Sequence, residues 1–504
     1  MKAQAVGITG TDNRTFTSSA AAAGPYDPPI AVITLTGDGL TIDDVESVAR
    51  GRRAVELSGE ARQRMAVARA AAERMAGGGE RVYGLTTGLG ALREIDQRAA
   101  DTERYSAVTI QAHTTGHGPL VAGEIVRAAM LHRANALARG RSMVRPEVAD
   151  AYVKALNDGF EPPVHAVGSV GQSDLPAMAE IARGLLEQGL CLEPGEALAM
   201  LNANSLSVGQ AALAIGGLRR LLSAYDGVAA LSLEGFAANL SMLHPEIPDA
   251  RPYRGLAKSV SRIRAALEGS SLWEPGAARS LQDPLSFRCI PQVHGALRDA
   301  ASFAGGQIEI ELNASGDNPM VVPAEDRVVS VGNFDITPVA AALDLLRLSL
   351  AHALTASGER VQKLLAEAFS GLPTGLRADD SPDDVLDILG VGAAALSAEA
   401  RLLAMPVSLE MPTSTIAGGI EDHVTMAPLA ARRLDEMLRL GSRLCAVEAQ
   451  VAAQAVDLRR PPRLGDGTAL VHRGIRRRVA FVGPGEAPSN NLDDLADWLL
   501  AGAR

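Results

Sequence analysis

Apolar residues recur at helical spacing along most of the chain, and runs that alternate between apolar and polar positions are rare. Segments rich in Ala and Leu, with good helix propensity, cover residues 60–75, 124–139, 338–369 and 429–456. The last two are long enough to cross a whole molecule. The pattern therefore predicts a mainly α fold with long helices.

Several predicted helices are bounded by residues that typically start or stop a helix. Thr41-Ile-Asp-Asp44 resembles a capping box at the start of a first helix, and three glycines at 77–79 stop the second one. Gly140 ends another helix, and Pro146 stands where the first turn of the next would begin. These signals predict where helices begin and end.

Strand signals are confined to short runs. Residues 30–36 predict a short strand or hairpin ahead of the first helix, and residues 320–322 and 327–331 alternate in the manner of strands. Aromatic residues, which favour strands, make up only 3% of the chain. The sequence thus predicts only a small mixed part at the N-terminal side.

The chain shows no linker-like change of composition after its first residues. Residues 1–30 are rich in Ser, Thr, Gly, Pro and Ala and predict a flexible tail without an export signal. Residues 31–504 predict a single unit, with an N-terminal active-site part at 31–200 and a central helical bundle at 201–504. The charge-free window 197–218 contains asparagines, serines and glycines, so we expect a buried helix there and not a membrane span.

The composition of the chain limits which partners and metals the protein is expected to bind. Forty-eight basic and fifty-nine acidic residues give a net charge of −11, and no basic run could neutralise a phosphate backbone, so we expect no nucleic acid partner. Three scattered cysteines fit a reducing cytoplasm better than a disulfide framework or a thiolate zinc site, and we expect no metal. Long Ala-rich helices bury their apolar stripes most easily against other helices, including those of other subunits, which predicts a homo-oligomer.

Four segments carry more glycine and polar residues than their surroundings. They are Tyr83-Gly-Leu-Thr-Thr-Gly-Leu-Gly90, Gly168-Ser-Val-Gly-Gln-Ser-Asp-Leu175, Gln282-Asp-Pro-Leu-Ser-Phe-Arg288 and Asn313-Ala-Ser-Gly-Asp-Asn-Pro319. In this order the series resembles the family of histidine and aromatic amino acid ammonia-lyases and 2,3-aminomutases, over most of residues 31–460. The run Glu421-Asp-His-Val-Thr-Met-Ala-Pro428 adds to the resemblance, which is closest to histidine ammonia-lyase.

The resemblance implies an all-helical homotetramer that acts on a small-molecule substrate, with each active site drawing on more than one subunit. It also implies a methylidene-imidazolone electrophile, which forms when an Ala-Ser-Gly triplet cyclises and loses two waters. The substrate amine adds to this group, and a tyrosinate removes a β-proton. Matched position by position, the catalytic residues are Tyr83, as the base, and Glu421, at the amine end; the substrate-binding residues are His113, Asn202, Gln282, Phe334 and Arg288, whose guanidinium would grip a carboxylate.

One segment departs from the family. Where the family reads Gly-Ala-Ser-Gly-Asp-Leu, this chain reads Gly171-Gln172-Ser173-Asp174-Leu175, one residue shorter and without the cyclising glycine. Ring closure needs a tight backbone turn that glycine reaches cheaply and a β-substituted residue does not. We therefore predict a degenerate cofactor site at residues 172–174 and no methylidene-imidazolone, and hence no cofactor. The triplets at 314–316 and 356–358 are of a kind expected by chance in a chain rich in Ala and Gly.

Each candidate also has a structural interpretation. Tyr83 could be an ordinary buried tyrosine, Arg288 could pair with Asp283, and Glu421 could belong to a cluster of polar residues at a helix start. Ser173 and Asp174 could simply cap a helix that runs from Leu175 or Pro176 to Leu186. His113 and His117 stand four apart, but Gly116 and Gly118 disfavour a shared helix and hence a metal site.

Three functions remain open. The first is a lyase, isomerase or cyclase of specialised metabolism in which Tyr83 abstracts a proton from a carboxylate-bearing substrate without the electrophile. The second is a catalytically dead family member that acts as a binding or assembly subunit. The third is an ordinary histidine or aromatic amino acid ammonia-lyase.

Overall fold

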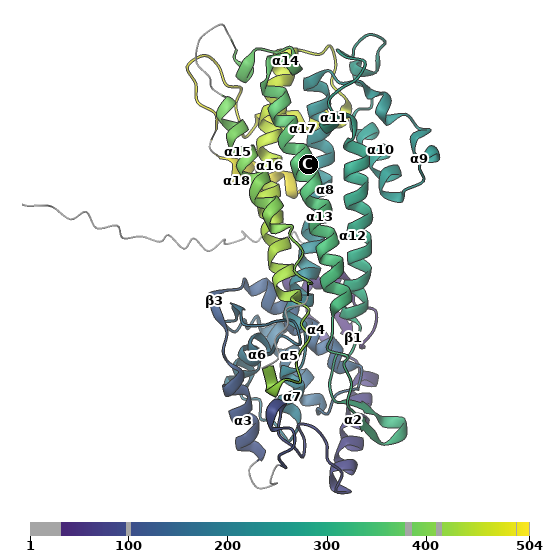
Figure 1. Cartoon of the computed structure of the whole chain (residues 1–504), viewed down its shortest axis with the longest axis vertical. Helices are drawn as coiled ribbons and strands as arrows, with labels where there is room; N and C mark the ends of the chain where they lie inside the picture. The colour runs from purple at the N-terminus through teal and green to yellow at the C-terminus, as the bar shows by residue number, and fades with distance from the viewer. Residues whose placement is uncertain (1–31, 97–101, 379–385, 410–415, 490, 503–504) are drawn as a thin grey trace, which may run out of the picture.

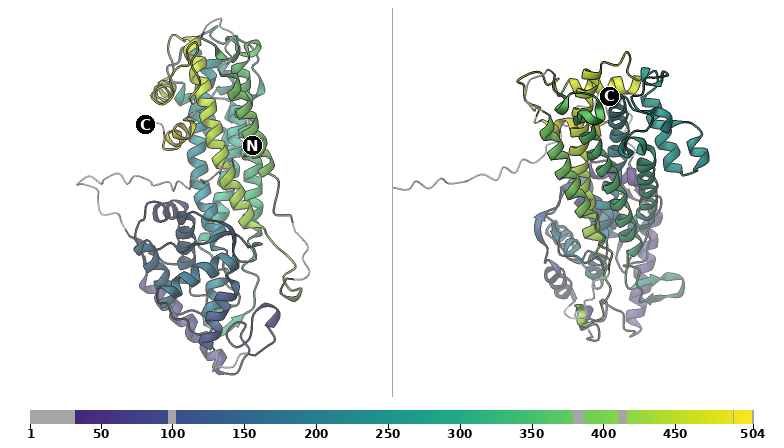
Figure 2. Two further views of the ribbon diagram at one scale, coloured as in Figure 1. Left: turned by 90° about the vertical axis from the view of Figure 1, so that its left-hand side faces the viewer. Right: turned by 45° about the horizontal axis from the view of Figure 1, so that its top comes forward.

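The protein is elongated, with a bundle of long helices at one end and a smaller mixed part at the other (Figures 1 and 2). The computed structural model describes residues 32–96, 102–378, 386–409, 416–489 and 491–502. The predicted tail at 1–30 lies outside the described residues. The described part of the chain is mainly helical, as predicted, and its six strands form three separate two-stranded sheets.

The smaller part is built by residues 32–96 and 102–201 and by two later segments, 313–336 and 416–426. Its helices are α1 (Ile42–Ala49), α2 (Gly59–Gly77), α3 (Thr102–His113), α4 (Gly123–Ala138), α5 (Pro146–Asp158), α6 (Leu175–Glu187) and α7 (Glu196–Leu201). Its strands are β1 (Ile33–Leu35), β2 (Val55–Leu57), β3 (His117–Leu120), β4 (His165–Val167), β5 (Met320–Val322) and β6 (Arg327–Val329).

The predicted start of the first helix is confirmed in detail. The Thr41 side chain accepts a hydrogen bond from the Asp44 N–H, and the Asp44 carboxylate accepts one from the Thr41 N–H, which completes a capping box. The strand before it is also present, but the hairpin alternative is wrong. β1 pairs in parallel with β2, which follows α1, so the helix forms the crossover between the two strands.

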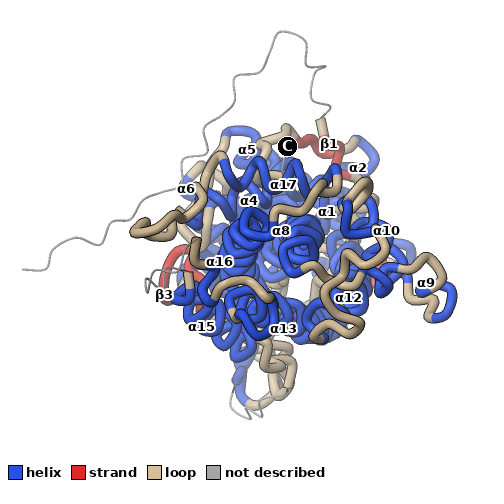
Figure 3. Tube along the Cα trace, turned by 90° about the horizontal axis from the view of Figure 1, so that it is seen from above, coloured by secondary structure: helices blue, strands red, loops and turns tan. Residues whose placement is uncertain are grey.

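The bundle is formed by the second part of the chain. Its long helices are α8 (Ser205–Phe236), α10 (Arg254–Ala266), α12 (Ile290–Leu312), α13 (Thr337–Leu365), α15 (Asp387–Leu403) and α16 (Ala427–Arg459). Short helices complete it: α9 (Ile247–Ala250), α11 (Leu285–Arg288), α14 (Glu367–Ser370), α17 (Asp466–Arg476) and α18 (Leu492–Leu500). Seen from above, α8 lies near the centre, with α16, α12 and α4 packed around it (Figure 3).

Small residues allow the central helices to approach closely. A Cβ added at Gly235 of α8 would lie 2.9 Å from Ala455 Cβ of α16, so glycine is needed at this crossing. The bundle interior also holds charge. Arg360 on α13 and Glu448 on α16 are both fully buried and form a two-pronged ion pair. The two hydroxyls of Ser232 and Ser357 donate to the same carboxylate, which ties α8, α13 and α16 together.

Two helical stretches, Glu196–Phe236 and Thr337–Leu365, are long and apolar enough to cross a membrane by length and composition. The apolar window of the first is entirely buried inside the protein. This agrees with the expected buried helix at 197–218. The stretch is interrupted, because α7 ends at Leu201 and α8 begins at Ser205. The break places the buried side chains of Asn202 and Asn204 outside regular helix, at the point where the small part meets the bundle.

Candidate functional site

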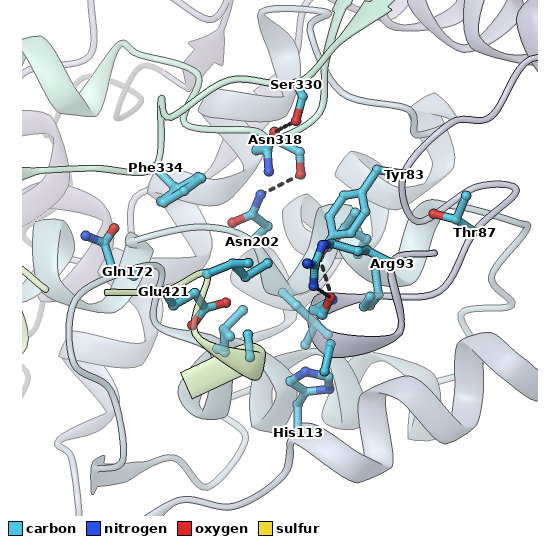
Figure 4. Close-up of a pocket in the computed structure, with 18 of the residues that line it drawn as sticks. Tyr83, Thr87, Arg93, His113, Gln172, Asn202, Asn318, Ser330, Phe334 and Glu421 are labelled. Carbon is cyan, nitrogen blue, oxygen red and sulfur yellow. Dashed lines mark hydrogen bonds between the residues drawn. The ribbon is translucent and has the colours of Figure 1, made fainter. Parts of the chain in front are cut away.

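A cavity of about 640 Å³ lies in the smaller part of the molecule (Figure 4). Its walls come from the loop after α2, the end of α3, the segment before α6, the α7–α8 break and two loops from the second half of the chain. Six of the residues that the sequence singled out line this one cavity: Tyr83, His113, Gln172, Asn202, Phe334 and Glu421. Segments far apart in the sequence thus meet where the motif order predicted a site.

Tyr83 begins a glycine-rich loop that folds back on its own side chain. Gly84 and Gly90 have φ of +72° and +54°, a backbone region that glycine adopts without strain. The return of the loop brings the Gly90 N–H to the Tyr83 hydroxyl oxygen, which accepts its hydrogen bond at 2.9 Å. Burial raises the pKa of the Tyr83 phenol, while this hydrogen bond opposes the shift.

His113 and Glu421 lie on another side of the cavity. His113 is the last residue of α3, and its Nδ1 lies 2.8 Å from the carbonyl oxygen of Thr109. This contact places the proton on Nδ1 and leaves Nε2 as an acceptor in the neutral ring. Burial raises the pKa of the Glu421 carboxyl, and the nearby His113 lowers it in part. His117 belongs to β3, so the two histidines do not share a helix.

The interpretation of Glu421 as part of a helix start is wrong. Glu421 follows a short 3-10 turn at Ile416–Gly418, and α16 begins only at Ala427. The turn contacts the Gly90–Leu92 turn of the Tyr83 loop. The loop before α16 therefore reaches down from the bundle and presents the carboxyl to the cavity.

Asn202 connects the cavity to the degenerate segment. Its side-chain oxygen accepts a hydrogen bond from the Ser173 hydroxyl, and its nitrogen donates to the Asn318 carbonyl oxygen at 2.8 Å. Ser173 has φ of +63°, which is uncommon for a residue with a side chain. Both hydrogen bonds fix the amide of Asn202 at the cavity wall.

Asp174 stands at the N-cap position of α6, which starts at Leu175 as predicted, but its side chain does not cap that helix. The fully buried carboxylate instead accepts hydrogen bonds from the N–H and the hydroxyl of Ser207, at 2.8 and 2.9 Å, in the first turn of α8. It also accepts one from the Ser169 hydroxyl at 3.0 Å. The prediction that Asp174 caps α6 is thus wrong. Its carboxylate caps α8, a helix distant in sequence.

Gln172 occupies the first position of the degenerate triplet and is 9% exposed. Its side-chain nitrogen donates to the Asp335 carboxylate at 3.2 Å, and His423 forms an ion pair with the same carboxylate. Thr425 completes the surroundings, because its hydroxyl donates to the Gly171 carbonyl oxygen at 2.9 Å. A Cβ on Gly171 would approach that hydroxyl to 2.1 Å, so only glycine fits there.

Gln282 and Arg288 are not brought to this cavity within the chain. Both are exposed and lie beside and within α11, in the bundle and away from the cavity (Figure 1). The alternative pairing of Arg288 with Asp283 is also wrong, since the described residues contain no ion pair between them. Asp283 instead accepts a hydrogen bond from the Asn239 N–H at 2.6 Å.

Sequence reasoning missed several charged residues of the cavity. Arg81, Arg93 and Glu94 line it, and they flank the glycine-rich motif without belonging to it. Their position immediately before and after Tyr83-Gly-x-x-Thr-Gly-x-Gly was the available signal. Within the described residues, no three His, Cys, Asp or Glu side chains are grouped as metal ligands.

Comparison with known proteins gives consistent results along the whole chain. The family model of aromatic amino acid lyases matches residues 40–191 and 186–477. The histidine ammonia-lyase of Anaeromyxobacter sp. (strain K) is 34% identical over 505 residues, which cover 93% of this chain and 99% of that protein. The histidine ammonia-lyase of Caldanaerobacter subterraneus subsp. tengcongensis is 32% identical over 471 residues, 89% of this chain and 92% of that protein.

Solved structures agree with these relatives. The ergothioneine-degrading enzyme ergothionase of Treponema denticola, solved with desmethyl-ergothioneine sulfonic acid, superposes with a TM-score of 0.87 at 29% identity, covering 94% of this chain and 98% of that one. A tyrosine aminomutase of Streptomyces globisporus reaches the same TM-score at 28% identity, covering 94% and 97%.

Proposed function

The chain belongs to the aromatic amino acid lyase family and is thus a carbon–nitrogen lyase by descent, and we propose that it eliminates an amine without the family's self-made electrophile. In this reaction Tyr83 removes the β-proton of a carboxylate-bearing substrate. The electron pair of the broken C–H bond forms a Cα=Cβ double bond, and the C–N pair leaves with the nitrogen. The observation that carries the proposal is the state of residues 172–174 beside a cavity lined by Tyr83, Asn202 and Glu421.

The residues at 172–174 do not fit the cyclised group. To close the ring, the nitrogen of the third residue must attack the carbonyl carbon of the first. Here that nitrogen belongs to Asp174, and its N–H donates to the Ala203 carbonyl oxygen at 2.8 Å. Moving it would also pull the buried carboxylate away from Ser207 and Ser169, and leaving such a group unsatisfied is costly.

Without the electrophile, the leaving group must be good on its own. A quaternary ammonium group meets this need, because it departs as a neutral tertiary amine and requires no covalent activation. Ergothioneine, the compound named for the Treponema denticola structure, is a trimethylammonium betaine of this kind. We therefore propose that the substrate class of this protein is a trimethylammonium betaine derived from an amino acid.

The cavity offers groups suited to such a substrate. The Phe334 ring and the Glu421 carboxyl both line it, and an aromatic face and a carboxylate attract a quaternary ammonium. Tyr83 lies on another wall, with its hydroxyl oxygen held by Gly90 (Figure 4). Base and cation-binding groups thus border the same volume from different sides.

Arg288 enters the proposal through a second copy of the chain. It is exposed, and the described residues give its side chain no hydrogen bond or ion pair. The bundle also exposes large apolar side chains: Phe303 and Ile310 on α12, and Leu345 and Leu348 on α13. Such a surface favours burial against another bundle. We propose a homotetramer in which a neighbouring copy supplies the carboxylate clamp.

Two measurements test the reaction. Intact mass spectrometry is expected to give the encoded mass, and the purified enzyme is expected to release trimethylamine from trimethylhistidine or ergothioneine but no ammonia from histidine. A mass lower by two waters, together with ammonia release from histidine, would make the protein an ordinary ammonia-lyase. Release of neither amine from these compounds or from the trimethyl betaines of phenylalanine and tyrosine would contradict the proposed substrate class.

Complementation tests the shared site. Tyr83→Phe and Arg288→Ala are each expected to be inactive alone. Co-expressed, they are expected to regain part of the activity, because some sites in mixed tetramers combine an intact Tyr83 with an intact Arg288. Failure of the co-expressed pair, despite a proven mixed tetramer, would show that one copy supplies both residues.

A further inference from the structure

Arg93 is a cation of the pocket that the family resemblance does not account for. It follows the Gly90–Leu92 turn, is half-buried, and lines the cavity together with Tyr83. Its Nη1 donates only a long hydrogen bond, 3.4 Å, to the carbonyl oxygen of Gly90. Among the described residues Arg93 has no ion-pair partner, so none of their carboxylates neutralises its charge.

Arg81, at the same rim, provides the contrast. Its guanidinium forms ion pairs with Glu94 and Asp96, both at 2.9 Å. These contacts neutralise the charge of Arg81. The two arginines of the cavity wall therefore differ. Within the described residues Arg81 is paired with two carboxylates and Arg93 with none, so Arg93 can interact with an anionic group inside the cavity.

The Tyr83 hydroxyl is arranged as an acceptor. It receives the Gly90 N–H, and it donates no hydrogen bond to any side chain or carbonyl of the described chain. Gly90 links the two residues, since its N–H faces the phenol oxygen and its carbonyl oxygen receives Arg93. Figure 4 shows the guanidinium of Arg93 at the hydroxyl end of the Tyr83 ring. The accepted hydrogen bond and the nearby cation both favour ionisation of the phenol, while burial opposes it.

The groups that act on Tyr83 come from three elements. Burial, Glu421 from the loop before α16 and Tyr105 from α3 raise the pKa of the phenol. The Gly90 hydrogen bond and the Arg93 charge lower it. Of the other charged or titratable groups that line the cavity, Arg81 and Glu94 neutralise each other, and His113 acts on Glu421. The net shift of the Tyr83 pKa is upward, because burial outweighs the lowering effects, and Arg93 is the cation that limits this rise.

We propose that Arg93 is the positioning residue of Tyr83, whose guanidinium favours the phenolate against the burial that opposes it, so that the phenol oxygen can accept the substrate proton. The inference rests on the proposed function, in which Tyr83 is the base. Arg93 acts on the reaction through Tyr83. The positive charge of Arg93 stabilises the negative charge on the phenolate oxygen, as an oxyanion-binding group stabilises an oxyanion in other enzymes, and it is in place before the substrate binds.

The test is a titration of Tyr83 that needs no substrate. A tyrosinate absorbs at longer ultraviolet wavelength than a tyrosine, and the difference between the wild type and Tyr83→Phe isolates one of the six tyrosines in the chain. Burial raises the pKa of Tyr152 and Tyr225 strongly, so these two ionise only at high pH. The same difference is measured in the Arg93→Gln, Arg93→Lys and Arg81→Gln backgrounds.

Arg93→Gln is expected to move the Tyr83 titration to higher pH, Arg93→Lys to restore part of the shift, and Arg81→Gln to leave it in place. With an active substrate, the acidic limb of kcat/KM is expected to move with the titration. An unmoved titration in Arg93→Gln, or an equal shift in Arg81→Gln, would overturn the proposal. If the titration shifts but no betaine is turned over, the proposed substrate class fails and the role of Arg93 stands.

Discussion

The buried charges of the bundle and the charges of the pocket are held in opposite ways. Arg360 and Glu448 are fully buried, paired at two points and further bound by serines. Arg93 and Glu421 are half-buried and have no ion-pair partner within the described chain. Nearly every charge inside a protein is paired, so unpaired charges in a cavity indicate that a ligand or a reaction uses them.

The largest effect is expected from breaking the buried ion pair of the bundle. Arg360→Met leaves the Glu448 carboxylate buried without its counter-ion, and we expect a loss of about 3–5 kcal/mol in the free energy of unfolding. Denaturant unfolding measures it. The double variant Arg360→Met, Glu448→Met is the matched control and is expected to be much more stable than the single one. A single variant as stable as the wild type would mean that the pair does not hold the three helices.

Tyr83→Phe probes the pocket side. Loss of a general base costs about 10²–10⁴-fold in rate, and we expect kcat to fall within this range while KM changes little. The unfolding midpoint is expected to stay within a few degrees, because only one hydrogen bond, from the Gly90 N–H, is lost. Tyr253→Phe, at an exposed tyrosine of the bundle, is the control. Retained activity in Tyr83→Phe would exclude this residue as the base.

Asp174 lies at the boundary between the two regions. Like the buried charges of the bundle, its carboxylate is fully buried and held by several hydrogen bonds. Asp174→Asn places an amide N–H₂ where Ser207 and Ser169 now donate, and we expect a loss of roughly 1–3 kcal/mol of stability. Calorimetry or denaturant unfolding checks it. Ser169→Ala, which removes one of these donors, is expected to cost less. If Asp174→Asn were neutral, residues 172–174 would be free to rearrange, and the argument against ring formation would weaken.

Much of the fold followed from local chemistry. Helix propensity, the Thr41 capping box and the Gly140 and Pro146 signals predicted both ends of α2 and α4 and the starts of α1 and α5 to within about two residues, because short-range interactions decide such ends. The predicted helix at 338–369 stops earlier, at Leu365, since Ala366 adopts an extended conformation before a separate short helix. The strand partner of β1 was missed because pairing is a tertiary choice.

In the site, too, some features could be predicted from the sequence and others could not. Motif order predicted six cavity residues, since those residues belong to recognisable segments. The target of the Asp174 carboxylate could not be predicted, because Ser207 lies 33 positions away and only the folded chain brings it near. Arg93 lies outside the motif and was indicated only by its position shortly after it, and its lack of an ion pair among the described residues becomes visible only in the folded chain.

The smallest expected effect concerns the pH dependence set by Glu421. Burial raises the pKa of this carboxyl, so it becomes protonated at a higher pH than an exposed glutamate as the pH falls. A cationic substrate group is attracted only by the ionised form, so KM for a betaine is expected to rise as the pH drops through this raised pKa. Glu421→Gln is expected to raise KM about fivefold, since a half-buried ion pair contributes about 1 kcal/mol, and to flatten this limb of the profile. Because Glu421 also opposes ionisation of Tyr83, the same variant is expected to lower the pKa of the phenol. An unchanged KM profile in Glu421→Gln would place the cationic end of the substrate elsewhere in the cavity and leave the unpaired carboxyl without a ligand.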